Sequence, residues 1–195
     1  MTNSSDFQIK DGVLLKYTGD SSNIVLPEGI TEIGQFAITS NERIKSIKLS
    51  STVQKIDESS FLCGQCLKNI YCDEKNKTFT SIDGILYSKD KSLLVAVPEG
   101  VEDNFEIKSF VKEIGCFAFT DCKNITKIKI PSNVTKIGIN AFTTCNNLKD
   151  IYISESVNEI GNDAFIDCES LTIHGVKGSY AQFFCEINNI TFAPL

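Results

Sequence analysis

The chain has 195 residues, a net charge of −6, and 42% hydrophobic and 23% charged residues. This composition excludes a disordered chain, and the lack of a basic block argues against nucleic-acid binding through phosphate contacts. The longest apolar run, Leu93–Val97, is too short to span a membrane. The chain has one histidine and no tryptophan, so histidine-based catalysis has little material. Its eight cysteines are too few for a small disulfide scaffold of this length.

The first predicted element is a β-hairpin within residues 1–23. Asp11-Gly12 separates two apolar segments that begin at Phe7 and Val13. Asp-Gly in this setting is a strong hairpin signal, because both turn residues need positive φ. The start of the sequence, MTNSSDF, has no charged region followed by an apolar one, so we expect no secretory signal in it and a cytoplasmic location stays open.

A repeat of 23 residues follows within residues 24–172. Every copy is apolar at its origin and at the second, sixth, ninth, fourteenth and twentieth residues after it. The apolar–x–apolar start predicts a short strand with one buried face, and stacked coils can bury that face although one coil cannot. The period therefore predicts a solenoid with a parallel sheet along one side and a single helical or 3₁₀ turn in each coil, as at Ile139–Thr144. The copies begin at Ile24, Ile47, Phe105, Ile128 and Ile151.

Residues 73–104 interrupt the period. Asp83-Gly84 lies between apolar segments like those around Asp11-Gly12, so we expect a second β-hairpin inserted in the stack. Each hairpin is followed by an apolar strand and the tripeptide Pro-Glu-Gly, at residues 27–29 and 98–100. No glycine- or serine-rich linker separates the two halves, so we expect one domain over residues 1–195.

The longest complete repeat, Ile128–Leu148, has the form I-x-I-P-x-x-V-x-x-I-G-x-x-A-F-x-x-C-x-x-L. From Phe7 to Phe192 the chain resembles the BspA-like leucine-rich repeats of bacterial and protist surface proteins. The resemblance implies a β-rich α/β solenoid, a right-handed β-α superhelix. It also implies a C-terminal cap over residues 173–195 with one short helix, and a location on the cell surface or outside the cell.

The resemblance is incomplete after the strand, where Asn133 is followed by Val134 and other copies place Ser or Thr. The pattern therefore does not predict the asparagine ladder of the common leucine-rich type.

The cysteines form two groups. Cys122, Cys145 and Cys168 recur at the repeat period, and we expect buried, reduced thiols because their parallel Cβ directions do not suit a disulfide. Cys63 and Cys66 form a CxxC pair followed by Cys72, which is too few ligands for a zinc site, and we predict neither a metal nor a cofactor. Local packing or one disulfide explains this pair, and a thiol-redox enzyme using Cys63 and Cys66 is a less favoured alternative.

The sequence contains five N-x-S/T sequons, which are N-glycosylation sites only for a protein that enters a eukaryotic secretory pathway. They are at Asn3, Asn76, Asn124, Asn133 and Asn189.

The residue after each repeat origin points away from the core, because strand side chains alternate. Tyrosines and long basic side chains in this row suit protein contacts. We therefore predict a non-catalytic protein-binding module, adhesin-like, with a host matrix or surface protein as a possible partner. A structural spacer without a ligand is the alternative, in which these residues are only solvated. After Val25, which starts the row, the candidate binding face consists of Lys48, Tyr71, Glu106, Lys129, Tyr152 and His174.

Overall fold

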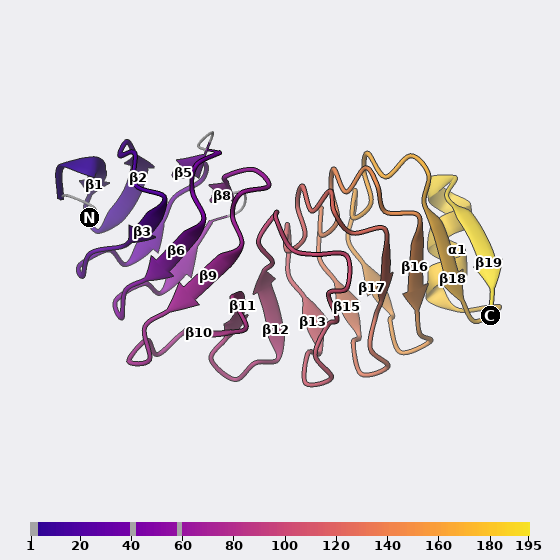
Figure 1. Ribbon diagram of the computed structural model, residues 1–195. Coiled ribbons are helices and arrows are strands. Elements are labelled where there is room, and N and C mark those ends of the chain that lie inside the picture. Colours follow the sequence, from indigo (N-terminus) through magenta and orange to yellow (C-terminus); the bar gives the residue numbers. More distant parts are fainter. Residues whose placement is uncertain (1–3, 40–41, 58–59) are drawn as a thin grey trace.

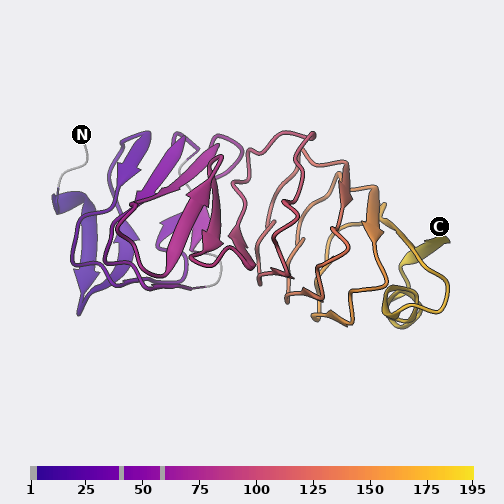
Figure 2. The same ribbon diagram turned by 90° about the horizontal axis from the view of Figure 1, so that it is seen from below.

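The computed structural model describes residues 4–39, 42–57 and 60–195. Figure 1 shows a solenoid whose coils lie side by side, from a β-hairpin at the N-terminal end to helix α1 (Tyr180–Asn188) at the C-terminal end. Figure 2, seen from below, shows the two termini at opposite ends of the stack. A 3₁₀-helix, Ser4–Asp6, precedes the first strand. The predicted β-rich solenoid with a helical C-terminal cap is therefore confirmed.

The strands predicted at the repeat origins lie along one side of the solenoid. Their side chains alternate between core and surface, as in β16 (Asp150–Ile153), where Ile151 and Ile153 are buried. The prediction of one parallel sheet is wrong, because the strands form a sheet of three and a separate sheet of four. The first contains β3 (Asn23–Val25), β6 (Ser46–Leu49) and β9 (Asn69–Cys72), and the second contains β14 (Lys127–Lys129), β16, β18 (Thr172–Gly175) and β19 (Thr191–Pro194).

A second row of short strands, which the repeat pattern did not predict, ends at the ninth position after each origin. In each strand a charged residue precedes a core isoleucine, and neighbouring coils pair in parallel, as Glu113, Lys136 and Glu159 do. These strands are β4 (Glu32–Ile33), β7 (Lys55–Ile56), β13 (Glu113–Ile114), β15 (Lys136–Ile137) and β17 (Glu159–Ile160). A further pair consists of β5 (Ile38–Thr39) and β8 (Phe61–Leu62).

Both predicted hairpins are present. β1 (Phe7–Lys10) pairs antiparallel with β2 (Val13–Tyr17), and β10 (Phe79–Ile82) pairs antiparallel with β11 (Ile85–Ser88). Both Asp-Gly turns have positive φ at each residue. The two hairpins join the second row differently: β2 pairs directly with β4, whereas β11 first pairs with an extra strand, β12 (Leu93–Ala96), which then pairs with β13.

Strand β11 separates two hydrophobic cores. Its Leu86 packs into the N-terminal core, whereas Ile85 and Tyr87 on its opposite face pack into the C-terminal core. All three side chains are buried, which is the pattern of a strand covered on both faces. The inserted hairpin is thus an internal wall of the stack.

Polar side chains tie adjacent coils together just after the first-row strands. They donate to the carbonyl at the sixth position of the preceding coil, so each coil satisfies a backbone acceptor of its neighbour. A mixed ladder of Thr, Asn and Ser thus takes the place of a pure asparagine ladder. The bonds are Thr52 Oγ1 to Ile30 O at 2.8 Å, Asn133 Nδ2 to Val111 O at 2.7 Å, and Ser156 Oγ to Val134 O at 2.7 Å.

The segment Ile139–Thr144 forms consecutive hydrogen-bonded turns rather than the predicted helical or 3₁₀ turn. Thr143 N–H donates to Asn140 O at 3.1 Å, but Asn140 and Thr144 both have positive φ, which ends any helical progression. Phe142 N–H instead bonds Ala164 O of the next coil at 2.8 Å. The turn backbone is therefore held mainly by the adjacent coil.

Candidate functional site

The predicted binding row is divided into two groups by the break between the first-row sheets. Lys48 and Tyr71 are in register on β6 and β9, next to Val25 of β3. Lys129, Tyr152 and His174 are in register on β14, β16 and β18. Glu106 lies in the coil between the sheets and belongs to no strand.

The C-terminal group forms a pre-organised cluster of side chains. The Tyr152 and His174 rings are stacked with centroids 4.4 Å apart and planes inclined by 6°. This spacing follows from their registered positions on adjacent parallel strands. Lys127 Nζ lies 4.8 Å from the Tyr152 centroid, and His174 Nε2 lies 2.6 Å from Asp150 Oδ1. We call Lys127, Asp150, Tyr152 and His174 the aromatic ladder.

Lys127 and Asp150 were missed by the sequence prediction, which took only one residue from each strand. The signal was nevertheless present, because residues two apart on a strand share a face: Lys127 with Lys129, and Asp150 with Tyr152. The ladder contains a His–Asp pair but places no serine, threonine or cysteine against the imidazole among the described contacts. The stacked rings, with Lys127 and Asp150 at their edges, form a flat and amphipathic surface of the kind that suits protein contacts.

In the N-terminal group, Lys48 and Tyr71 have fewer contacts that hold their side chains in place. Lys48 Nζ lies 3.7 Å from Asp73 Oδ2, which is a long, exposed ion pair. Tyr71 is 44% exposed and makes no ring contact within the described chain. The two halves of the predicted face therefore differ: Tyr152 is held between cationic and aromatic neighbours, and Tyr71 is not.

The CxxC pair does not have the features of a redox site. Cys63 is buried, its Sγ lies 3.4 Å from Ile38 O, and burial raises the pKa of its thiol to about 12. Such a thiol is protonated and a poor nucleophile at neutral pH. Cys66 is exposed, and neither residue is in a disulfide.

The three periodic cysteines are buried free thiols, as predicted. Cys145 Sγ donates to Phe119 O at 3.0 Å and Cys168 Sγ to Phe142 O at 3.2 Å, so each thiol caps a turn of the preceding coil. Cys122 makes a longer contact to Pro98 O, at 3.7 Å. Burial raises the thiol pKa at all three positions.

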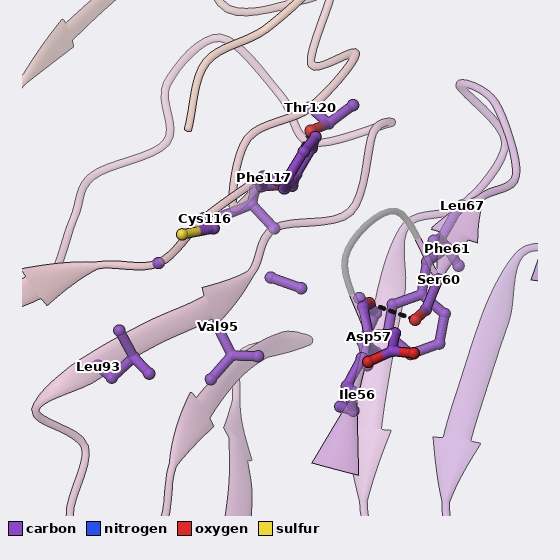
Figure 3. A pocket seen from close by; sticks show the side chains of 14 residues that line it. Ile56, Asp57, Ser60, Phe61, Leu67, Leu93, Val95, Cys116, Phe117 and Thr120 are labelled. Carbon is purple, nitrogen blue, oxygen red and sulfur yellow. Dashed lines mark hydrogen bonds between the residues drawn. The ribbon is translucent and has the colours of Figure 1, made fainter. Parts of the chain in front are cut away.

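A cavity of about 290 Å³ lies between the two halves of the stack. Figure 3 shows Ser60 and Phe61 on one side and Cys116 and Phe117 on the other, with Leu93 and Val95 from β12 below Cys116 and Phe117 in this view. Among the described residues that line it, Asp57 is the only one with a charged side chain. The cavity is therefore a small, mainly apolar space at the internal wall.

The sequons lie in different environments. Asn76 is 0% exposed, and its side chain makes four hydrogen bonds with backbone groups, so it is inaccessible to a modifying enzyme in the folded chain. Asn124 and Asn133 bond carbonyls of the preceding coil, and Asn189 is the C-cap of α1. Asn3 lies outside the described residues.

The described part of the chain contains neither a membrane-spanning helix nor a cluster of metal-binding side chains. No helix within it is both long and apolar enough to cross a membrane. Its His, Cys, Asp and Glu side chains form no group of three or more that could hold a metal ion.

The repeated coil, the two rows of short strands and the solvent-facing ladder define a leucine-rich repeat protein. Residues 12–97 and 100–191 match the family model described as "BspA type Leucine rich repeat region (6 copies)". The chain belongs to the BspA-type leucine-rich repeat family. None of the curated proteins compared with the chain matches it.

Solved structures of bacterial leucine-rich repeat proteins are similar to this chain. A leucine-rich repeat protein from Eubacterium ventriosum is 28% identical with a TM-score of 0.70, and the match covers 80% of this chain and 42% of that one. A leucine rich cell surface protein from Faecalibacterium prausnitzii is 20% identical with a TM-score of 0.46, covering 87% and 62%. The chain thus spans about two fifths of the Eubacterium protein.

Proposed function

We propose that the protein is a non-catalytic protein-binding module and that the aromatic ladder is the centre of its binding face. The observation that carries the proposal is the fixed geometry of Tyr152, held between Lys127 and His174 on three adjacent strands. Ordered aromatic side chains lose little conformational entropy when a partner covers them, and tyrosine is enriched among residues that dominate binding energy. We also propose Lys48, Tyr71, Glu106 and Lys129 as the periphery of this face.

Family membership supports this function, since solenoid proteins bind partners along their extended faces. It also supports a location on the cell surface or outside the cell, with an adhesin-like role toward host matrix or surface proteins. Immunogold labelling of thin sections through the cells tests the location: a label confined to the cell interior contradicts it.

The binding test compares the protein with a Tyr152→Ala/His174→Ala variant on immobilised, purified host extracellular-matrix proteins. We expect binding of at least one matrix protein to fall about tenfold or more, because residues at the centre of an interface contribute most of the affinity. The matched control is Lys136→Ala/Glu159→Ala, which removes an exposed ion pair from the second row of strands. Binding that is equal in all three proteins would contradict the proposed face.

The alternative function is a spacer that holds other domains apart without a ligand. A spacer needs only the stacked core, so it gives no reason for the ladder side chains to be ordered. If no matrix protein binds and cells producing the Tyr152→Ala/His174→Ala variant adhere to host cells like wild type, the spacer is the better account.

A further inference from the structure

The break in the first row leaves the outer edge of β14 without a strand partner among the described residues. The outer edge of β9 is covered by the inserted hairpin, since the Ile70 N–H donates to Gly84 O at 2.7 Å and the Cys72 N–H donates to Ser81 Oγ at 3.0 Å. The intervening coil repeats the strand pattern with Phe105 and Ile107, but it forms no strand. A side chain replaces the missing ladder bond: Asp103 accepts from the Thr126 N–H at 2.5 Å and from the Thr126 hydroxyl at 2.8 Å. The coil is thereby held beside β14 without completing the sheet.

Two adjacent hollows border this coil, and we refer to the two together as the groove. The first, of about 600 Å³, is bounded by residues 103–109 and by β14 with the residues next to it. The second, of about 500 Å³, is bounded by the same coil and by Lys68, Asn69 and Asp83. Because Asn104, Phe105 and Glu106 line both hollows, the groove continues across the predicted binding face.

The groove has an apolar base and a defined pair of free charges. The half-buried Phe105 and Pro131 line the first hollow, together with Ile107 and Ile128, which are only 7% and 2% exposed. Within the described chain, Glu106 and Lys129 have no ion-pair partner, although they occupy equivalent positions in adjacent coils and both line the first hollow. The other charged side chains of the lining have partners of different kinds. In the second hollow Lys108 pairs with Asp83 at 3.0 Å, and Lys68 pairs with Glu102 at 3.1 Å. In the first hollow Asp103 accepts from the Thr126 hydroxyl, and Lys127 lies over the Tyr152 ring.

We infer that this groove binds an extended segment of the partner protein that carries a large apolar side chain between an acidic and a basic residue. The apolar side chain covers Phe105 and Pro131, the acidic residue pairs with Lys129, and the basic residue pairs with Glu106. The inference rests on the proposed protein-binding function and adds the chemistry of the segment recognised. Opposite free charges on the two walls also select the direction of the segment, since the reversed sequence places like charges together.

The first test selects a randomised 12-residue peptide library, displayed on phage, against the immobilised full chain and against a Glu106→Lys/Lys129→Glu variant. Both substituted side chains are exposed, so the variant should fold like wild type, as checked by its thermal unfolding curve. We expect wild type to enrich peptides with an apolar residue between an acid and a base. The charge-reversed variant should enrich the opposite order of charges. No enrichment on wild type, or the same order of charges on both proteins, overturns the inference.

The second test uses a synthetic peptide of the wild-type consensus. An Asn104→Trp variant fills the groove while leaving both charges in place, and we expect it to weaken this peptide about tenfold or more. The Lys136→Ala/Glu159→Ala variant is the matched control, because this exposed ion pair lies in the second row of strands and neither residue lines the groove. Equal affinity for Asn104→Trp and wild type overturns the inference. If matrix binding is lost in the ladder variant but unchanged in both groove variants, the proposed function stands and the groove inference fails.

Discussion

The two halves of the molecule use the same repeat with different interiors. In the C-terminal half the Phe119, Phe142 and Phe165 rings stack from coil to coil, with centroids 4.6 and 5.4 Å apart. In the N-terminal half the equivalent positions hold Ile38 and Phe61, which lie on the short parallel strands β5 and β8. Where the A-F-x-x-C sequence is complete, its Phe rings stack and the backbone forms hydrogen-bonded turns. Where the sequence is incomplete, the same segment forms a third row of short strands.

This difference indicates that the C-terminal half depends more on each repeated side chain. A stacked ring contacts the coil before it and the coil after it, whereas Ile38 pairs its backbone mainly with one neighbour. The comparison predicts where a single substitution has a large effect and where it has a small one.

The largest effect is expected for Phe142→Ala. This side chain is 0% exposed and stacks on both neighbouring rings, so its truncation should lower the free energy of unfolding by about 4 kcal/mol. The half-buried Phe61 of the N-terminal half is the matched control, and Phe61→Ala should cost about 1–2 kcal/mol. Urea denaturation followed by circular dichroism measures both, and equal losses contradict the proposed difference between the halves.

The same variant tests whether the halves unfold together. We propose that they do, as one domain, because β11 is buried against both cores. Hydrogen exchange measured by mass spectrometry should then accelerate in N-terminal as well as C-terminal peptides of Phe142→Ala. Acceleration restricted to the C-terminal half would show that the cores are separate folding units.

The next largest effect is expected for Asn76→Ala, at the boundary between the halves. Asn76 replaces the apolar sixth residue of the repeat, and its amide bonds Ser50 O and Val53 O, both at 2.9 Å. Its carbonyl accepts from the Thr78 and Phe79 N–H groups. Truncating the Asn76 side chain leaves these buried backbone groups without hydrogen-bond partners, so the free energy of unfolding should fall by about 3 kcal/mol.

Asn124→Ala is the matched control for Asn76, since Asn124 is exposed and makes one bond to the preceding coil. Its loss should cost less than about 1 kcal/mol. Thermal unfolding measures the stability of both variants. A larger loss of stability for Asn124→Ala than for Asn76→Ala would contradict the structural role given to the buried Asn76.

A third prediction concerns Glu99, which is 2% exposed and has no hydrogen-bond partner for either carboxylate oxygen in the described chain. Burial, and then the charge of Asp121, raise the pKa of Glu99 to about 7, against smaller opposing effects of the Cys63–Gly64 backbone and Lys123. The folded chain therefore retains a proton that the unfolded chain loses near its ordinary pKa. Stability should fall as pH rises from about 4.5 to about 7, by about 3 kcal/mol in total.

Glu99→Gln removes this dependence and should be more stable than wild type at pH 8 but similar to it at pH 4. The matched control is Glu28 in the other Pro-Glu-Gly segment, which is exposed and accepts from the Ser51 N–H and hydroxyl. Those bonds lower the pKa of Glu28, so Glu28→Gln should change stability in the opposite direction at neutral pH. Parallel pH–stability curves for Glu99→Gln and wild type would disprove the role given to the buried carboxyl.

These glutamates illustrate what could not be predicted from sequence. The tripeptide Pro-Glu-Gly is identical at both places, but one copy follows a first-row strand and the other follows β12, inside the wall between the cores. The break at Phe105 has the same origin. Its local pattern is that of a strand, and only the distant Asp103–Thr126 contact shows why it is not one.

The successful predictions rested on local signals that recur. Asp-Gly turns predicted both hairpins, and alternating apolar residues predicted the first-row strands and their outward side chains. Period 23 predicted the stacked Cys122, Cys145 and Cys168. The groove beside Glu106 had no such signal, because it results from how two halves of unequal interior meet.

The smallest effect is expected from the buried cysteines, which are the periodic Cys122, Cys145 and Cys168 in the C-terminal half and Cys63, one position earlier in its repeat, in the N-terminal half. Cys145→Ala removes a buried sulfur and its bond to Phe119 O, so it should cost about 1–2 kcal/mol. Cys145→Ser keeps a donor for that carbonyl and should recover part of the loss. In the N-terminal half Cys63 has a longer contact, 3.4 Å to Ile38 O, so Cys63→Ala should cost less than Cys145→Ala. Cys66→Ala, at an exposed site, should change the unfolding midpoint least of all. If Cys66→Ala lowers the unfolding midpoint as much as Cys145→Ala does, the packing role of the periodic thiols is contradicted. The CxxC pair would then need a function of its own.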